Sequence, residues 1–181
     1  MTGELLPGTQ SRRAAVFGWI IFIGFFVLLW NILQLPRTAL DARQGLRIFH
    51  DSLGLIVMVL AVVQLARMLL GPRLSPPAGL PENSFGFNRA LLAAIYLTLF
   101  ATGAIGFLFA FGEWNRPVIL FGAELPQLVA EGDSVRKPFG YLHSALSFYY
   151  MMLAAIWLAY GFYQHLRYKV GMSRLFPGSR V

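Results

Sequence analysis

Two histidines, His50 and His143, stand near the beginning of two long apolar segments, in the stretches RIFHDSLG (47–54) and GYLHSALS (140–147). If each segment is a helix that rises about 1.5 Å per residue, both imidazoles lie roughly 3–6 Å below the mouth of their helix. A neutral imidazole is a good ligand for iron. Two imidazoles on facing helices can hold a haem between them. The placement therefore predicts a bis-histidine haem site with His50 and His143 as axial ligands.

A porphyrin fits between helices only where small residues stand beside the ligands. Gly54 follows His50 by four residues, so it lies one helical turn below the histidine on the same face. We expect Gly54 to give clearance for the macrocycle. Other small residues on the third and fourth apolar segments are expected to make room as well: Gly103, Gly106, Ser144 and Ser147.

The haem propionates are anions and need cations at the membrane surface. Arg47 precedes His50 by three residues and lies on its face of the helix, so it is the first choice as a propionate partner. Lys137 is a second choice, and Arg116 and Arg136 are near in the sequence.

Other interpretations of the two histidines stay open at this point. A single histidine at a helix end can be an ordinary interfacial residue. A histidine pair within a membrane can also relay protons or donate hydrogen bonds to a quinone. A zinc site is disfavoured because the chain has no cysteine and no clustered carboxylates. His165 follows about 33 Å further along the segment of His143, where we expect an interfacial residue.

The segments that carry these residues have the composition of membrane spans. The chain has 181 residues, of which 57% are hydrophobic and 13% charged, whereas a soluble domain carries about 25% charged residues. Four apolar runs, at about 14–34, 47–70, 89–111 and 141–165, each approach the ~20 residues that a helix needs to cross a bilayer. Backbone polar groups in lipid must be satisfied within the segment. We therefore predict an all-α integral membrane four-helix bundle that forms a single domain.

The basic residues predict the orientation of these spans. Nine basic and two acidic residues lie on the side of both termini, whereas six of each lie on the other side. Positive residues accumulate on the cytoplasmic side of membrane proteins, so both termini are expected there. The net charge of +7 is then a topological signal, and we expect no nucleic-acid partner. The loop 112–140 is expected to be periplasmic and to lie on the membrane surface as a lid.

Taken together, these features resemble the bacterial cytochrome b561 family, whose members are small inner-membrane b-type electron carriers with two haems. The resemblance includes the pattern RxxH-x3-G at residues 47–54, the histidine that opens the fourth span, and the stretch TGAIGFLFAF (102–111). It continues through NRPVILFGAELP (115–126) and the basic tail HLRYKVGMSRLFP (165–177). The resemblance implies haem b, a location in the bacterial inner membrane, and His50 and His143 as ligands of the periplasmic-side haem.

The resemblance breaks at the second haem of the family. Where family members carry a histidine early in the first span, this chain has Phe17 or Gly18. The expected place in the third span holds Leu92, and that in the fourth holds Trp157 or Leu158. We therefore expect one haem b rather than two, and electron exchange on one face of the membrane rather than across it.

Two classes of function follow from this sequence. The first is electron transfer between a quinol or quinone, such as ubiquinone, and a periplasmic or membrane partner, as an electron carrier or oxidoreductase component. The second is an accessory or assembly subunit of a larger respiratory or photosynthetic complex, or a homodimer, with a structural haem or none. A transporter is less favoured, because the spans carry almost no charge away from their ends.

Overall fold

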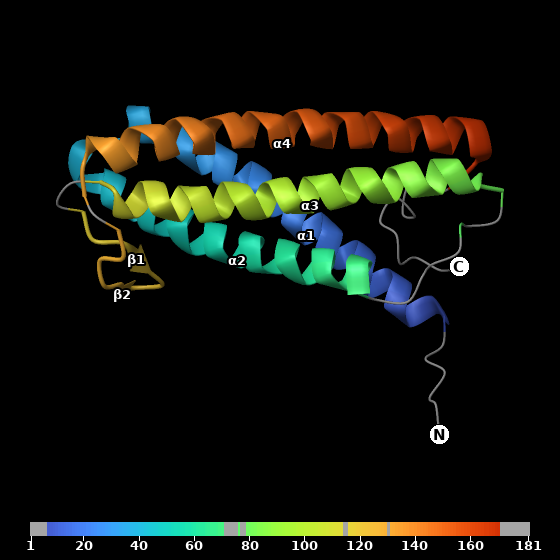
Figure 1. Ribbon diagram of the computed structural model, residues 1–181, viewed down its shortest axis with the longest axis horizontal. Helices are drawn as coiled ribbons and strands as arrows, with labels where there is room; N and C mark the ends of the chain where they lie inside the picture. The colour runs from blue at the N-terminus through green and yellow to red at the C-terminus, as the bar shows by residue number, and fades with distance from the viewer. Residues whose placement is uncertain (1–6, 71–75, 77–78, 114–115, 130, 171–181) are drawn as a thin grey trace, which may run out of the picture.

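Four long helices make up most of the protein (Figure 1). The structure is a computed structural model, and it describes residues 7–70, 76, 79–113, 116–129 and 131–170. The helices are α1 (Pro7–Gln34), α2 (Arg43–Leu70), α3 (Glu82–Phe111) and α4 (Asp133–Tyr168). Two short 3-10 turns, η1 (Leu35–Arg37) and η2 (Leu40–Ala42), join α1 to α2. All four helices are long and apolar enough to cross a membrane, which confirms the predicted all-α membrane bundle.

The helices are longer than the spans expected from the sequence. α4 begins at Asp133, so residues 133–140, expected as part of the loop, are helical. A hydropathy profile detects only the part of a helix that lies in hydrocarbon. It does not detect polar turns by which the helix continues into water. The loop between α3 and α4 is therefore 112–132. We call these residues the lid, and the end of the bundle that carries them the lid end.

Helices that are neighbours in the sequence are neighbours in space: α1 packs on α2, α2 on α3, and α3 on α4. Figure 1 shows α3 and α4 side by side along the long axis, with α1 and α2 inclined to them. Large apolar side chains remain exposed along every helix, as a lipid-facing surface requires. Examples are Ile23, Val59, Leu97 and Phe148.

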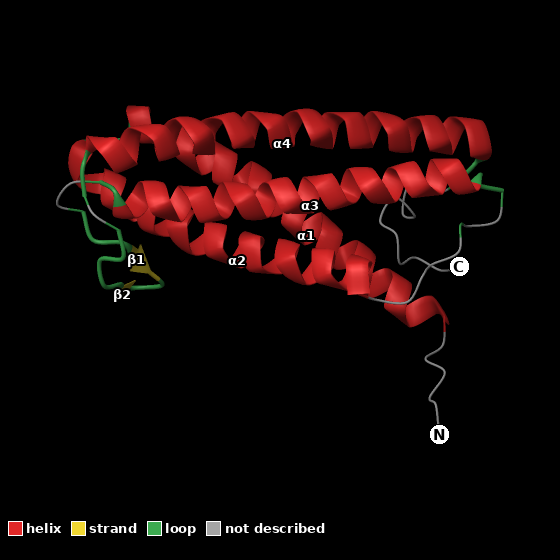
Figure 2. Ribbon diagram, in the orientation of Figure 1, coloured by secondary structure: helices red, strands yellow, loops and turns green. Residues whose placement is uncertain are grey.

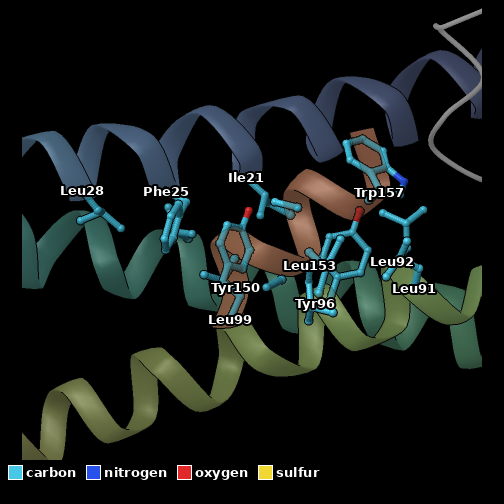
Figure 3. Packing of buried hydrophobic residues seen from close by; sticks show 14 residues of the cluster. Ile21, Phe25, Leu28, Leu91, Leu92, Tyr96, Leu99, Tyr150, Leu153 and Trp157 are labelled. Carbon is cyan, nitrogen blue, oxygen red and sulfur yellow. The ribbon is translucent and has the colours of Figure 1, made fainter. Parts of the chain in front are cut away.

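A core of aliphatic and aromatic side chains fills the middle of the bundle and the half away from the lid (Figure 3). Tyr150, Leu153 and Trp157 of α4 meet Leu92 and Tyr96 of α3 there. Phe25 of α1 lies against Tyr150, with ring centroids 3.9 Å apart. The space between the helices in this part of the bundle is therefore filled by side chains.

The lid contains the strands of the described region, which Figure 2 shows at one end of the helices. β1 (Ile119–Leu120) and β2 (Ala123–Glu124) form an antiparallel hairpin, with Leu120 opposite Ala123. The inner side of the hairpin packs in a second apolar cluster with the end of α3. That cluster consists of Ala110, Phe111, Val118 and Leu120. The lid is thus attached to the bundle by its own small core.

Candidate haem site at the lid end

The fold brings His50 of α2 and His143 of α4 together at the lid end. Their ring centroids are 6.3 Å apart, and the ring planes are inclined by 77°. Two imidazoles that each bind one metal ion through a nitrogen at about 2.0 Å have centroids roughly 6 Å apart. The two rings therefore stand at a separation that fits one iron between them.

The ring of His143 is oriented by α3. Its Nδ1 donates a hydrogen bond to the backbone carbonyl of Thr102, at 2.9 Å. A carbonyl oxygen can only accept, so the proton of a neutral ring lies on Nδ1 and Nε2 is left available as a metal ligand. Such an outer hydrogen bond is the usual way in which proteins hold a ligand histidine. Gly106 provides the space, because a Cβ built there would lie 2.8 Å from the His143 ring.

The ring of His50 is held less completely. Its Nδ1 is buried and faces the backbone carbonyl of Leu28 in α1, but the geometry falls short of a regular hydrogen bond. A buried polar atom without a partner costs free energy in an apolar bundle. With Nδ1 directed at the Leu28 carbonyl, Nε2 is the ring nitrogen of His50 left available as a metal ligand.

A cavity of about 540 Å³ lies between the helices at the two histidines. This volume falls in the range of small-molecule and cofactor sites, roughly 300–1,000 Å³. Gly54 lies on its wall, and a Cβ built there would meet nothing within 4 Å. The position thus borders open space, as clearance for a flat ring requires. The donor set and the cavity together fit a haem.

Gly103 and Ser147 were also expected to leave space for the macrocycle, but their surroundings differ from those of Gly54. Gly103 lines the cavity, but a Cβ there would approach the Met58 side chain to 2.8 Å, so this glycine also admits Met58. Ser147 donates its hydroxyl to the His143 carbonyl at 2.9 Å and is not among the residues that line the cavity. Ser144, one turn nearer the lid end, does line it.

An ion network joins the lid to α2 beside the cavity. Arg116 of the lid pairs with Asp51 of α2 at 2.8 Å and with Glu113, which also belongs to the lid. Arg47 pairs with Glu113 at 3.3 Å. We call these four residues the ion network; all of them line the cavity. The network contains two cations and two carboxylates, so its charges balance. Within it, Arg47 is already paired with Glu113.

The cations at the start of α4 are compensated less fully. Lys137 pairs with Asp133 at 2.8 Å, and Arg136 pairs with the same carboxylate at 3.0 Å. Both basic residues line the cavity. Two cations share one carboxylate here, which leaves a net positive charge for a propionate. This arrangement favours Lys137 and Arg136 over Arg47 as the source of that charge.

Several features of the site were not expected from the sequence. They are the carbonyl of Thr102 and the carboxylates of Asp51 and Glu113. Asp51 is the neighbour of His50 in the sequence, and Glu113 and Arg116 have the spacing of a local ion pair. The sequence shows this adjacency and this spacing. It does not show that the lid folds back and brings Arg116 to Asp51.

Two comparisons with known proteins identify the family of the chain. The family model described as prokaryotic cytochrome b561 matches residues 9–178. The chain is also similar to the cytochrome b561 homolog 2 of Escherichia coli (strain K12). The two are 29% identical over 158 residues, which are 83% of this chain and 81% of the relative.

Proposed function

Since the chain belongs to the prokaryotic cytochrome b561 family and is therefore a membrane b-type cytochrome of electron transfer, we propose that it holds one haem b between His50 and His143. When bound, the haem supplies a centre that takes up and releases one electron. The observation that carries the assignment is the pair of imidazoles, 6.3 Å apart, on a cavity whose wall includes Gly54.

Each residue of the site has a separate role in this proposal. His50 and His143 would hold the iron through their ring nitrogens. Gly54 and Gly103 form the wall against the macrocycle. Lys137, with Arg136, supplies the charge for a propionate, and Arg47 contributes within the ion network. The lid restricts water at the mouth, and water access is one of the factors that set a haem potential.

The packing of the other half of the bundle supports a single haem. Leu92 and Trp157 are two of the residues expected, with Leu158, at the positions of the second haem's histidines, and each is only 1% exposed. Trp157 packs against Trp19 and Phe22 of α1, with ring centroids 6.5 Å and 6.0 Å apart. The third histidine, His165, has its Nδ1 2.9 Å from the carbonyl of Val170, just after the end of α4. Buried bulky side chains occupy this half of the bundle, which supports one haem rather than two.

A single centre near one end of the bundle confines electron exchange to that end. We place the lid end on the periplasmic side of the bacterial inner membrane, with both termini in the cytoplasm, because the basic residues are concentrated on the side of the termini. The protein then passes electrons between a membrane quinol, such as ubiquinol, and a periplasmic or membrane partner.

A pyridine haemochrome measurement on the purified protein, expressed per polypeptide, tests the proposal. We expect one haem b per chain. His50→Ala and His143→Ala should each lose it, whereas His165→Ala, at the other end of α4, should retain it. Two haems per chain would contradict the single-site assignment. A folded protein without haem would contradict the cytochrome assignment and leave an assembly subunit of a larger complex.

A further inference from the structure

At the tip of the lid hairpin, a bulky aromatic residue adopts a left-handed backbone conformation. Phe121 and Gly122 connect β1 to β2 with φ angles of +52° and +87°. Two central residues with positive φ make a type I′ turn, which favours Asn-Gly. A bulky residue at positive φ is strained. The Phe121 side chain is nevertheless 64% exposed, so contacts within the described protein do not account for its presence.

The hairpin lies alongside α2, rather than beyond the end of the helix (Figure 1). The backbone N–H of Phe121 donates to the hydroxyl of Ser52 at 2.9 Å. Ser52 is about 13 Å along α2 from the start of the helix at Arg43. Leu55, one turn further along, packs against the apolar cluster of the lid. The tip is therefore held well inside the length of α2.

The length of α2 relates this position to the bilayer. Its 28 residues extend for about 42 Å, whereas the hydrocarbon core is about 30 Å thick. A helix centred in the bilayer then enters hydrocarbon about 6 Å from its end, so Ser52 lies within about 7 Å of the boundary with the head groups, on its hydrocarbon side. Exposed apolar side chains of α2 lie about one turn on either side of this level, at Phe49 and Ile56. The Phe121 side chain thus continues a lipid-facing surface.

We propose that the hairpin tip is a membrane anchor, in which Phe121 inserts at the boundary between head groups and acyl chains of the leaflet at the lid end. Aromatic rings are favoured at this boundary, and burial of an apolar side chain there offsets the backbone strain. The exposed carboxylate Glu124, on β2, limits the insertion to the tip. The anchor does not depend on the haem assignment, because it follows from the hairpin and α2 alone.

The absence of cysteine from the chain allows a direct test. Phe121→Cys and Glu124→Cys are each labelled with an environment-sensitive fluorophore, and the full-length protein is placed in phosphatidylcholine liposomes. We expect the label at 121 to be blue-shifted, quenched by lipids with a nitroxide near the carbonyl region, and protected from aqueous iodide. The matched label at 124 should be quenched by iodide. Ala123→Cys, next to the tip and exposed, serves as the second variant if Phe121→Cys does not fold.

Two results would overturn the anchor. If iodide quenches both labels equally in liposomes, the tip projects into water. If the label at 121 is protected from iodide and also from the lipid-borne nitroxide, the tip is covered by protein, either a second copy or another subunit. Cross-linking of the labelled cysteines in the same liposomes would separate those two occupants.

Discussion

The backbone carbonyl of Thr102 on α3 accepts a hydrogen bond from Nδ1 of His143 on α4, at 2.9 Å. This contact determines which ring nitrogen is available in the cavity. Since the acceptor belongs to the backbone of a packed helix, it has little freedom to move. The position of α3 therefore controls the position of the His143 imidazole, and Gly106, one turn beyond Thr102, leaves the space that the ring occupies.

Gly106→Ala should weaken haem binding. A Cβ at this position would lie 2.8 Å from the His143 ring, and overpacking of this kind costs about 1–3 kcal/mol. We expect the dissociation constant for haem to rise by roughly 10- to 100-fold, as measured by titration of haem into the apoprotein. Gly86→Ala is the matched control, because it lies on the same helix and meets nothing within 4 Å. Equal haem affinity in the two variants would show that Gly106 does not position the ring.

Arg116→Gln should lower the haem reduction potential. The substitution leaves Asp51 and Glu113 without their shared cation, and uncompensated negative charge near the iron stabilises the oxidised state. An interaction on the order of 1 kcal/mol at an effective dielectric of about 20 corresponds to a few tens of millivolts for a one-electron couple. A potentiometric titration measures the shift, and Asp51→Asn in the Arg116→Gln background should reverse part of it.

The control for this experiment is Arg43→Gln. Arg43 carries the same charge near the same end of α2, but its Nε donates to the Thr38 carbonyl and no ion pair of Arg43 is found among the described residues. Its loss should shift the potential less. Equal shifts in the two variants would mean that net charge at the lid end, rather than the ion network, sets the potential.

Asp133→Asn should slow the loss of haem. Asp133 is the carboxylate that Arg136 and Lys137 share, so its neutralisation frees both cations for a propionate. These side chains are substantially exposed, and the gain should be below about 1 kcal/mol and should shrink as salt is added. The rate of haem transfer to an acceptor protein at low and high ionic strength measures it. Faster loss at low salt would contradict a role for these cations.

The sequence was sufficient to place the two histidines and the helices that carry them. Long apolar runs identify membrane helices, because lipid leaves the backbone no other partner. The regular rise of a helix then places His50 and His143 at one depth. The start of α4 at Asp133 was not predictable in this way, since polar turns outside the hydrocarbon carry no hydropathy signal.

The surroundings of the histidines were harder to predict. The carbonyl of Thr102 has no sequence signature, because every residue has one. Arg116 and Asp51 are 65 positions apart in the chain, and their contact depends on how the lid folds back. Such contacts follow from tertiary packing, which local patterns do not encode.

Trp157→Ala should destabilise the protein without removing its haem. The side chain is 1% exposed and contacts two rings of α1, and truncation of a buried tryptophan costs about 3–5 kcal/mol. Thermal unfolding in detergent, followed by circular dichroism, should show this loss. The haem spectrum and the haem count per chain should stay unchanged, because His50 and His143 lie at the lid end. Ile156→Ala, exposed on the same helix, is the control and should have a small effect. If Trp157→Ala instead changed the haem spectrum, Trp157 would lie beside a haem, and the packed half of the bundle could not be the reason for a single site.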